Sequence, residues 1–300
     1  MSGDIFYWFF NMSITATITG MVVYLLGKIK FLPRRLMFIL WGIPFIRMWM
    51  PFGLGSEYSL MSLMSKLGTK TVIMWDERFT SMNSMQFAEE YFPNEYEISV
   101  LDTLFDVASI IWLVIAVAII VAVAVVYIIS RDDMGELIHL KDNTYMSDNV
   151  KTPIVYGIFR QKIILPRECE NQDITYILAH EKAHVSRGDN MWRALVFITV
   201  AINWFNPFAW LFFKNFLSDL ELSCDERVLN KLGEEEKKEY ATALLNCAES
   251  RTLFSSAFGG AKIRKRIENI LSYKKLSVLS IICFTIFAIA IAYLLLMNAL

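Results

Sequence analysis

The sequence predicts a mainly α membrane protein, with four transmembrane helices and a cytoplasmic α+β domain inserted between the third and fourth of them. The first reason is composition, since 55% of the 300 residues are hydrophobic and the mean hydropathy is +0.42. Soluble domains of this size usually contain roughly 45–50% hydrophobic residues. The second reason is that long uncharged runs flank one polar region, residues 131–275, in which short β-branched runs precede helical patterns.

Three uncharged runs are long enough to cross a bilayer core, which requires about 20 helical residues. They cover residues 5–27, 107–130 and 276–300. A fourth run, 36–54, is interrupted by Pro44 and Arg47, and we expect it to form a kinked spanning helix. The predicted membrane segments are therefore 1–52, with two helices and a short basic loop, then 106–130 and 276–300.

The distribution of charge predicts the topology. Basic residues follow the first run at 28–35 and also gather at 262–275, just before the last run, whereas residues 53–105 are predominantly acidic. Because lysine and arginine favour the cytoplasmic side, 131–275 is predicted to be cytoplasmic and 53–105 an external loop. The protein is then multi-pass in the cell membrane with both termini external. A net charge of −1 argues against direct nucleic-acid binding.

The polar region contains the pentapeptide His180-Glu181-Lys182-Ala183-His184. On a helix, residues four apart share one face, so His180 and His184 can bind one metal ion while Glu181 acts beside it as a general base. We therefore expect one Zn²⁺ per chain at a catalytic site. The alternative is a pair of ordinary histidines on a helix surface.

A catalytic zinc site needs a third protein ligand. Glu221 and Asp225 are four residues apart in a downstream acidic run, so Glu221 can complete the site while Asp225 hydrogen-bonds a ligand imidazole. Cys224 is the competing ligand, and helical geometry separates it from Glu221 only weakly. A solvated acidic helix face remains the alternative for the whole run.

Residues 194–213 are as apolar as a spanning helix. If they crossed the bilayer, Glu221 would emerge about 30 Å from the histidines. Asn203 and Asn206-Pro207 lie at their middle, where proline breaks helical hydrogen bonding and asparagine favours a turn. We therefore predict a bent apolar hairpin that keeps both halves of the site on one side of the membrane.

Two segments are candidates for contact with a polypeptide substrate. The β-branched runs 154–159 and 162–166 predict a strand pair, and an edge strand formed by Lys162, Ile163, Ile164 and Leu165 could hold an extended peptide. Plain structural strands are the alternative. Small and polar residues at 251–262 predict a mobile loop that could itself be cleaved.

Four segments of the chain match the motifs of one known family: 152–166, 180–184 with Asp189, 203–207 with Trp210, and 219–225. With these segments the chain resembles the BlaR/MecR-type membrane zinc metallopeptidases of antirepressor signalling. The resemblance implies a gluzincin-like peptidase domain in which Glu221 binds zinc, Asp225 supports the site and Asp189 follows the zinc helix. It also implies self-cleavage near Ser256, Ala257, Phe258 and Gly259.

The resemblance further implies a cytoplasmic protein substrate, typically a winged-helix transcriptional repressor of the BlaI/MecI type. Membrane lipid is the other expected partner, and a homodimer is compatible with the sequence. The sequence ends at Leu300, directly after the last apolar run. We therefore expect it to lack the C-terminal penicillin-binding sensor domain of the β-lactam receptors in this family.

The predicted function is a membrane-embedded regulatory zinc metalloendopeptidase. Two other functions fit parts of the pattern: a non-catalytic membrane sensor or scaffold with structural zinc, and a quality-control peptidase for membrane proteins. A structural zinc site is usually closed and rich in cysteine, whereas this motif leaves a coordination position open and adds a base.

Overall fold

A computed structural model describes residues 2–29, 31–50, 56, 58–60, 62, 98–167, 174–233, 235–249 and 256–297. The helices in the membrane-facing part are α1 (Ser2–Leu26), α2 (Arg34–Leu40), α3 (Gly42–Arg47), α6 (Ile98–Asp132) and α12 (Val278–Leu296). The strands are β1 (Ile138–Lys141), β2 (Thr144–Ser147), β3 (Ile154–Tyr156) and β4 (Lys162–Pro166). The remaining helices are α7 (Ile174–Arg187), α8 (Asp189–Ile202), α9 (Pro207–Leu229), α10 (Glu236–Glu249) and α11 (Ser256–Ser272).

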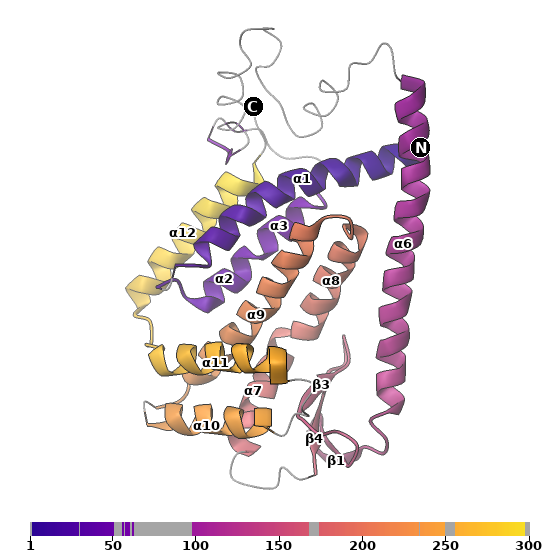
Figure 1. The fold of residues 1–300 in the computed structure, drawn as a ribbon. Coiled ribbons are helices and arrows are strands. Elements are labelled where there is room, and N and C mark those ends of the chain that lie inside the picture. The colour runs from indigo at the N-terminus through magenta and orange to yellow at the C-terminus, as the bar shows by residue number, and fades with distance from the viewer. Residues whose placement is uncertain are drawn as a thin grey trace.

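The apolar helices gather at one end of the molecule and the polar elements at the other (Figure 1). Helices α1, α2, α3, α8, α9 and α12 share one core, in which Trp41, Phe212 and Phe216 are buried. Long α6 stands along one side of this bundle, and the sheet, α7, α10 and α11 lie below it in the view of Figure 1. The fold is thus mostly helical with one small sheet.

Three helical segments are long and apolar enough to span a membrane by length and composition: Ile5–Leu26, Leu104–Asp132 and Val278–Leu296. The fourth span was predicted at 36–54. Its described residues form two short helices, α2 and α3, which are separated at Trp41. Pro44 explains the interruption, since it has no N–H to donate to the carbonyl of Leu40. The expectation of four long spanning helices is therefore not met by the described residues, although the predicted kink is present.

The apolar segment 194–213 forms the predicted bend. Helix α8 ends at Ile202, and Asn206 caps α9 by accepting a hydrogen bond from the N–H of Phe208. The Asn206 amide also donates to the Ser13 hydroxyl at 2.7 Å and the Thr17 hydroxyl at 2.8 Å, which fixes the tip of the hairpin against α1. The chain therefore reverses direction between α8 and α9, and the C-terminal half of α9 contacts α7.

A close approach between α1 and α9 holds this hairpin in place. A Cβ atom built on Gly20 would lie 2.2 Å from the ring of Phe212. Real atoms do not approach so closely, so a side chain at position 20 would force the two helices apart. Gly20 therefore permits the packing that positions α9.

Two carboxylates on one face of α9 attach it to α2. Asp219 accepts a hydrogen bond from the Trp41 indole at 2.8 Å. Glu226, two helical turns further on, accepts from the backbone N–H groups of Arg34 at 3.0 Å and Arg35 at 3.2 Å. Because Pro33 provides no side-chain cap for α2, Glu226 satisfies N–H groups that would otherwise be orphaned at the start of that helix.

The four strands form one sheet in the order β1-β2-β4-β3. Strand β4 pairs with β3 in antiparallel fashion, as the sequence predicted, and with β2 in parallel. The expectation that Lys162–Leu165 form a free edge strand for substrate is wrong, because both edges of β4 are already hydrogen-bonded. Strand β2, which sequence reasoning missed together with β1, is the second partner of β4.

The expectation of a mobile loop at 251–262 is wrong for residues 256–262, which are helical. Residues 250–255 lie outside the described residues, but Ser256, Ala257, Phe258 and Gly259 belong to α11. Ile263, Ile267 and Ile270 recur at helical spacing, and the last two pack with α9 and α10. Cleavage near Ser256 would therefore require the start of this helix to unwind.

One further expectation falls largely on residues outside the described part. Of the predicted external loop at 53–105, the structure describes residues 56, 58–60, 62 and 98–105, and the last of these begin α6.

Replacing Glu226 with alanine should lower the free energy of unfolding by about 1–3 kcal/mol, because two N–H groups at the start of α2 lose their acceptors. Unfolding in detergent, followed by tryptophan fluorescence, measures the change. Glu226→Gln retains one carboxamide oxygen as acceptor and should lose less. Wild-type stability in the alanine variant would contradict this role.

Candidate metal centre

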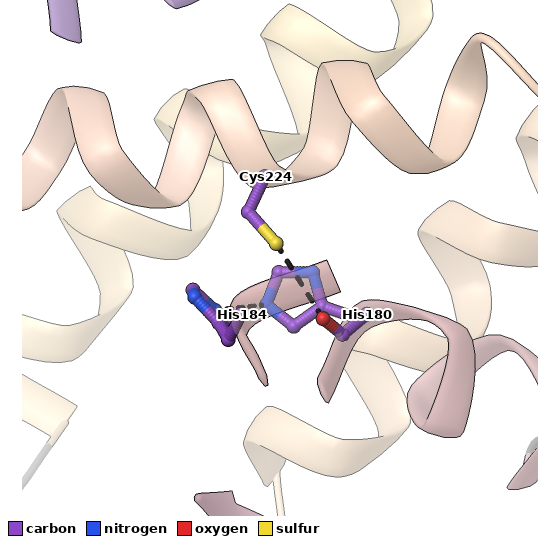
Figure 2. A group of neighbouring side chains, drawn as sticks. All are labelled: His180, His184 and Cys224. Atoms are coloured by element: carbon purple, nitrogen blue, oxygen red, sulfur yellow. Dashed lines mark hydrogen bonds between the residues drawn. The ribbon is translucent and has the colours of Figure 1, made fainter. Parts of the chain in front are cut away.

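The two histidines of the pentapeptide lie on the face of α7 that meets α9. Both are buried, with 4% of each residue exposed. Gly188 ends α7 in the left-handed region, with φ at +66°, a conformation that costs glycine little. Figure 2 shows His180 and His184 on one side of the site and Cys224 reaching toward them from α9.

Three side-chain atoms form a compact triangle. The Nε2 atoms of His180 and His184 are 3.1 Å apart, and the Oε2 atom of Glu221 lies 3.6 Å from each. The circle through these three atoms has a radius of about 2.0 Å, which matches the zinc–nitrogen and zinc–oxygen bond lengths. The spacing of the three atoms therefore fits a metal ion that all three side chains would hold.

Cys224 also belongs to this cluster. Its sulfur lies within 4.8 Å of ligand atoms of both histidines, and it donates a hydrogen bond to the carbonyl oxygen of His180 at 3.4 Å (Figure 2). The Glu221 oxygen lies 3.6 Å from both ring nitrogens. Glu221 and Cys224 are therefore both candidates for the third position beside the two histidines.

The second ring nitrogen of His180 faces a tyrosine and a carboxylate. Its Nδ1 atom lies 2.9 Å from the Tyr240 hydroxyl and 3.2 Å from Asp225. The same hydroxyl donates to Asp225 at 2.7 Å. Groups of this kind fix the orientation of a metal-binding imidazole. Asp225 thus lies where the sequence placed it, and Tyr240 joins it.

His184 has a corresponding partner. Its Nδ1 atom is 2.5 Å from Asp189, which is fully buried at the start of α8. Arg187 holds this carboxylate with two hydrogen bonds and donates to the Ser223 hydroxyl of α9 at 2.7 Å. The turn at Gly188 therefore brings Asp189 back onto the histidine that lies five residues before it.

Two arginines complete the surroundings. Arg266 of α11 donates to both oxygens of Asp225, at 2.8 and 2.7 Å, and lies 3.2 Å from Nε2 of His180. Arg193 of α8 donates to Glu221 at 2.5 Å. These side chains fix both carboxylates that α9 presents to the site.

Sequence reasoning missed Tyr240, Arg266 and Arg193. The basic residues at 262–275 had served only to predict the topology. Helical periodicity carried a signal for Arg266, since this residue is three positions after Ile263 and four before Ile270 and so shares their inward face.

The electrostatics favour ionised carboxylates around the histidines. Burial raises the pKa of Asp225, but the neighbouring Arg266 and His180 side chains together lower it, and the net shift is downward. Burial lowers the pKa of His184, whereas the hydrogen bond to Asp189 and its other neighbours raise it to about 10. Burial raises the pKa of the Cys224 thiol, but the two adjacent histidines lower it, and the resulting pKa is about 7.

Glu181 lies next to His180 on α7 and is partly buried. Among the described residues it has no hydrogen-bond or ion-pair partner. A carboxylate next to a candidate metal-binding histidine is of the kind that transfers protons in hydrolytic sites.

The model of the BlaR1 peptidase M56 family matches residues 7–272, which is most of the chain. The chain belongs to the M56 peptidase family. Members of this family are metallopeptidases, and the buried His180, His184 and Cys224 cluster lies inside the matched region.

Curated relatives carry regulatory names. The chain is 31% identical over 106 residues to the methicillin resistance mecR1 protein of Staphylococcus aureus, covering 34% of this chain and 18% of that protein. It is 27% identical over 149 residues to the regulatory protein BlaR1 of Bacillus licheniformis, covering 46% and 25% respectively. The match to BlaR1 of Staphylococcus aureus is 25% over 154 residues, covering 47% and 26%. Each match thus spans about a quarter or less of the relative's length.

Replacing Tyr240 with phenylalanine should weaken metal binding by about 10–100-fold, because His180 loses a hydroxyl that orients its ring. Competition with a chromogenic chelator measures the affinity. Tyr176→Phe is the matched control, since it removes an exposed hydroxyl that donates to Glu239 at 2.5 Å. Equal affinity in the two variants would show that Tyr240 does not orient the site.

Proposed function

We propose that this M56 protein is a membrane-embedded zinc metalloendopeptidase that hydrolyses a peptide bond in a cytoplasmic regulatory protein. The observation that carries the proposal is the triangle of His180, His184 and Glu221, whose dimensions fit a zinc ion. Glu181, which has no partner among the described residues, lies on the same helix as the histidines. Catalytic zinc sites keep one coordination position open, whereas structural zinc sites are closed. An open site beside a base therefore favours catalysis.

The roles of the residues follow from their chemistry. His180, His184 and Glu221 would hold the ion, while Asp225, Tyr240 and Asp189 orient the two imidazoles. A zinc ion held there would supply Lewis-acid chemistry, lowering the pKa of a water molecule and polarising a carbonyl. Glu181 would accept a proton from the attacking water and return it to the leaving amine.

We propose that the peptidase site faces the cytoplasm. The start of α1, the start of α6 and the end of α12 lie at the upper end of the molecule, and the sheet, α10 and α11 at the lower end (Figure 1). Lys28 follows the lower end of α1, Arg34 and Arg35 begin α2, and the basic residues 264–266 belong to α11 (Figure 1). Basic residues at this end are expected of a cytoplasmic side. Both termini would then be external.

The proposed substrate is a transcriptional repressor of the BlaI/MecI type. Family resemblance supports this substrate, together with the regulatory names of the relatives. A cytoplasmic site close to the inner membrane surface would be accessible to such a soluble protein. The segment that begins at Ser256 is a second proposed substrate, once its helix unwinds.

Glu181→Gln should retain bound zinc but lower the cleavage rate by at least about 100-fold, because the ligands remain and the base does not. Metal content by mass spectrometry and fragment yield from a co-expressed candidate repressor measure the two effects. Glu268→Gln is the control, since this glutamate lies exposed on α11 and pairs with Arg264. Wild-type cleavage by the Glu181 variant would refute the mechanism.

The third ligand can be tested in the same preparation. Glu221→Ala should lower zinc content to near background, whereas Cys224→Ala should leave it close to one ion per chain, because the carboxylate and not the thiol completes the site. The reverse pattern, with zinc lost only from the cysteine variant, would assign Cys224 as the ligand.

A further inference from the structure

A pocket of about 220 Å³ lies where α2 meets the end of α7 and the polar half of α9. It is separate from the metal centre, and no carboxylate is among the described residues that line it. The lining consists of three arginines, two apolar side chains and one hydroxyl, from Arg35, Phe38, Ile39, Arg187, Ser223 and Arg227.

Two of these arginines have unused hydrogen-bonding capacity. The Nε atom of Arg35 is buried and has no partner among the described residues, while its Nη2 donates to the carbonyl oxygen of Glu226 at 2.6 Å. Arg227 has no hydrogen bond or ion pair with any residue that the structure describes. A buried donor without an acceptor costs free energy, so the pocket favours a ligand that brings acceptor oxygens.

The position of the pocket identifies the source of those oxygens. The candidate span in α1 ends at Leu26, and α2 begins shortly afterwards at Arg34. Ile39, on the rim of the pocket, is 64% exposed, and nearby Phe31 is 75% exposed. Exposed apolar side chains beside arginines at the end of a membrane span are typical of the level where lipid headgroups meet acyl chains.

We propose that this pocket binds the phosphate headgroup of an anionic phospholipid, with Arg35 and Arg227 donating to the phosphate and an acyl chain lying along Ile39. Guanidinium groups suit this ligand because they present planar pairs of donors to phosphate oxygens. The Ser223 hydroxyl adds a smaller donor. The site does not depend on the peptidase activity proposed above.

The pocket nevertheless shares a residue with the metal centre. Arg187 lines it, with its guanidinium 4.8 Å from the centre of the Phe38 ring, and also holds Asp189, which hydrogen-bonds His184. Because Arg187 is committed to Asp189, its substitution would disturb both sites. Arg227, which has no such commitment among the described residues, is the residue to change.

Native mass spectrometry of the full chain, released from detergent after titration with phosphatidylglycerol or phosphatidylcholine, tests the proposal. Phosphatidylglycerol should bind more tightly, and Arg227→Gln should weaken its binding by about fivefold, the contribution expected of one arginine near an anionic lipid. Arg264→Gln is the matched control, because this α11 side chain is 82% exposed and lies outside the pocket. It should leave the affinity unchanged.

Two alternative explanations give different results in the same titration: the pocket binds free phosphate, or anionic lipid is attracted by surface charge in general. Millimolar inorganic phosphate should not displace phosphatidylglycerol, since it has no acyl chain to contact Ile39, and displacement would assign the pocket to free phosphate. Equal binding of the two lipids, or equal losses in the Arg227 and Arg264 variants, would overturn the proposal in favour of diffuse surface charge. An unchanged melting temperature in Arg227→Gln shows that the variant is folded.

Discussion

The structure depends on one helix, α9, that carries carboxylates on two faces. Asp219 and Glu226 hold one face to α2 in the membrane bundle. Glu221 and Asp225 occupy a different face, because a step of two residues from Asp219 to Glu221 turns a helix by about 200°, and they meet the histidines of α7. A single rigid element therefore connects the membrane bundle to the candidate metal centre, and movement of one face must move the other.

The charges buried around α9 are tolerable only because each has a partner. Burying an ionised side chain is costly unless another charge and several hydrogen bonds compensate. Asp225 has Arg266 and Tyr240, Asp189 has Arg187 and His184, and Glu221 has Arg193. These partners come from α7, α8, α10 and α11, so the site requires the whole polar half of the molecule to be assembled.

The sequence predicted an element well where residues within that element determine its conformation. The spacing of His180 and His184 indicated a helix face, and Asn206-Pro207 indicated a turn. Predictions were wrong where distant partners decided the outcome. Strand β4 is central because β2, which is some twenty residues earlier, occupies its other edge. Residues 256–259 are helical because isoleucines further along α11 pack against α9 and α10.

The sequence alone determined which residues have the chemistry for a metal site, and the need for Glu221 to reach two histidines determined that the apolar segment must bend back. Only the tertiary structure decided which side chains orient that site. Tyr240 and Arg266 lie 60 and 86 residues from His180 in sequence. No spacing rule connects positions so far apart, because their contact depends on how α10 and α11 pack across α9.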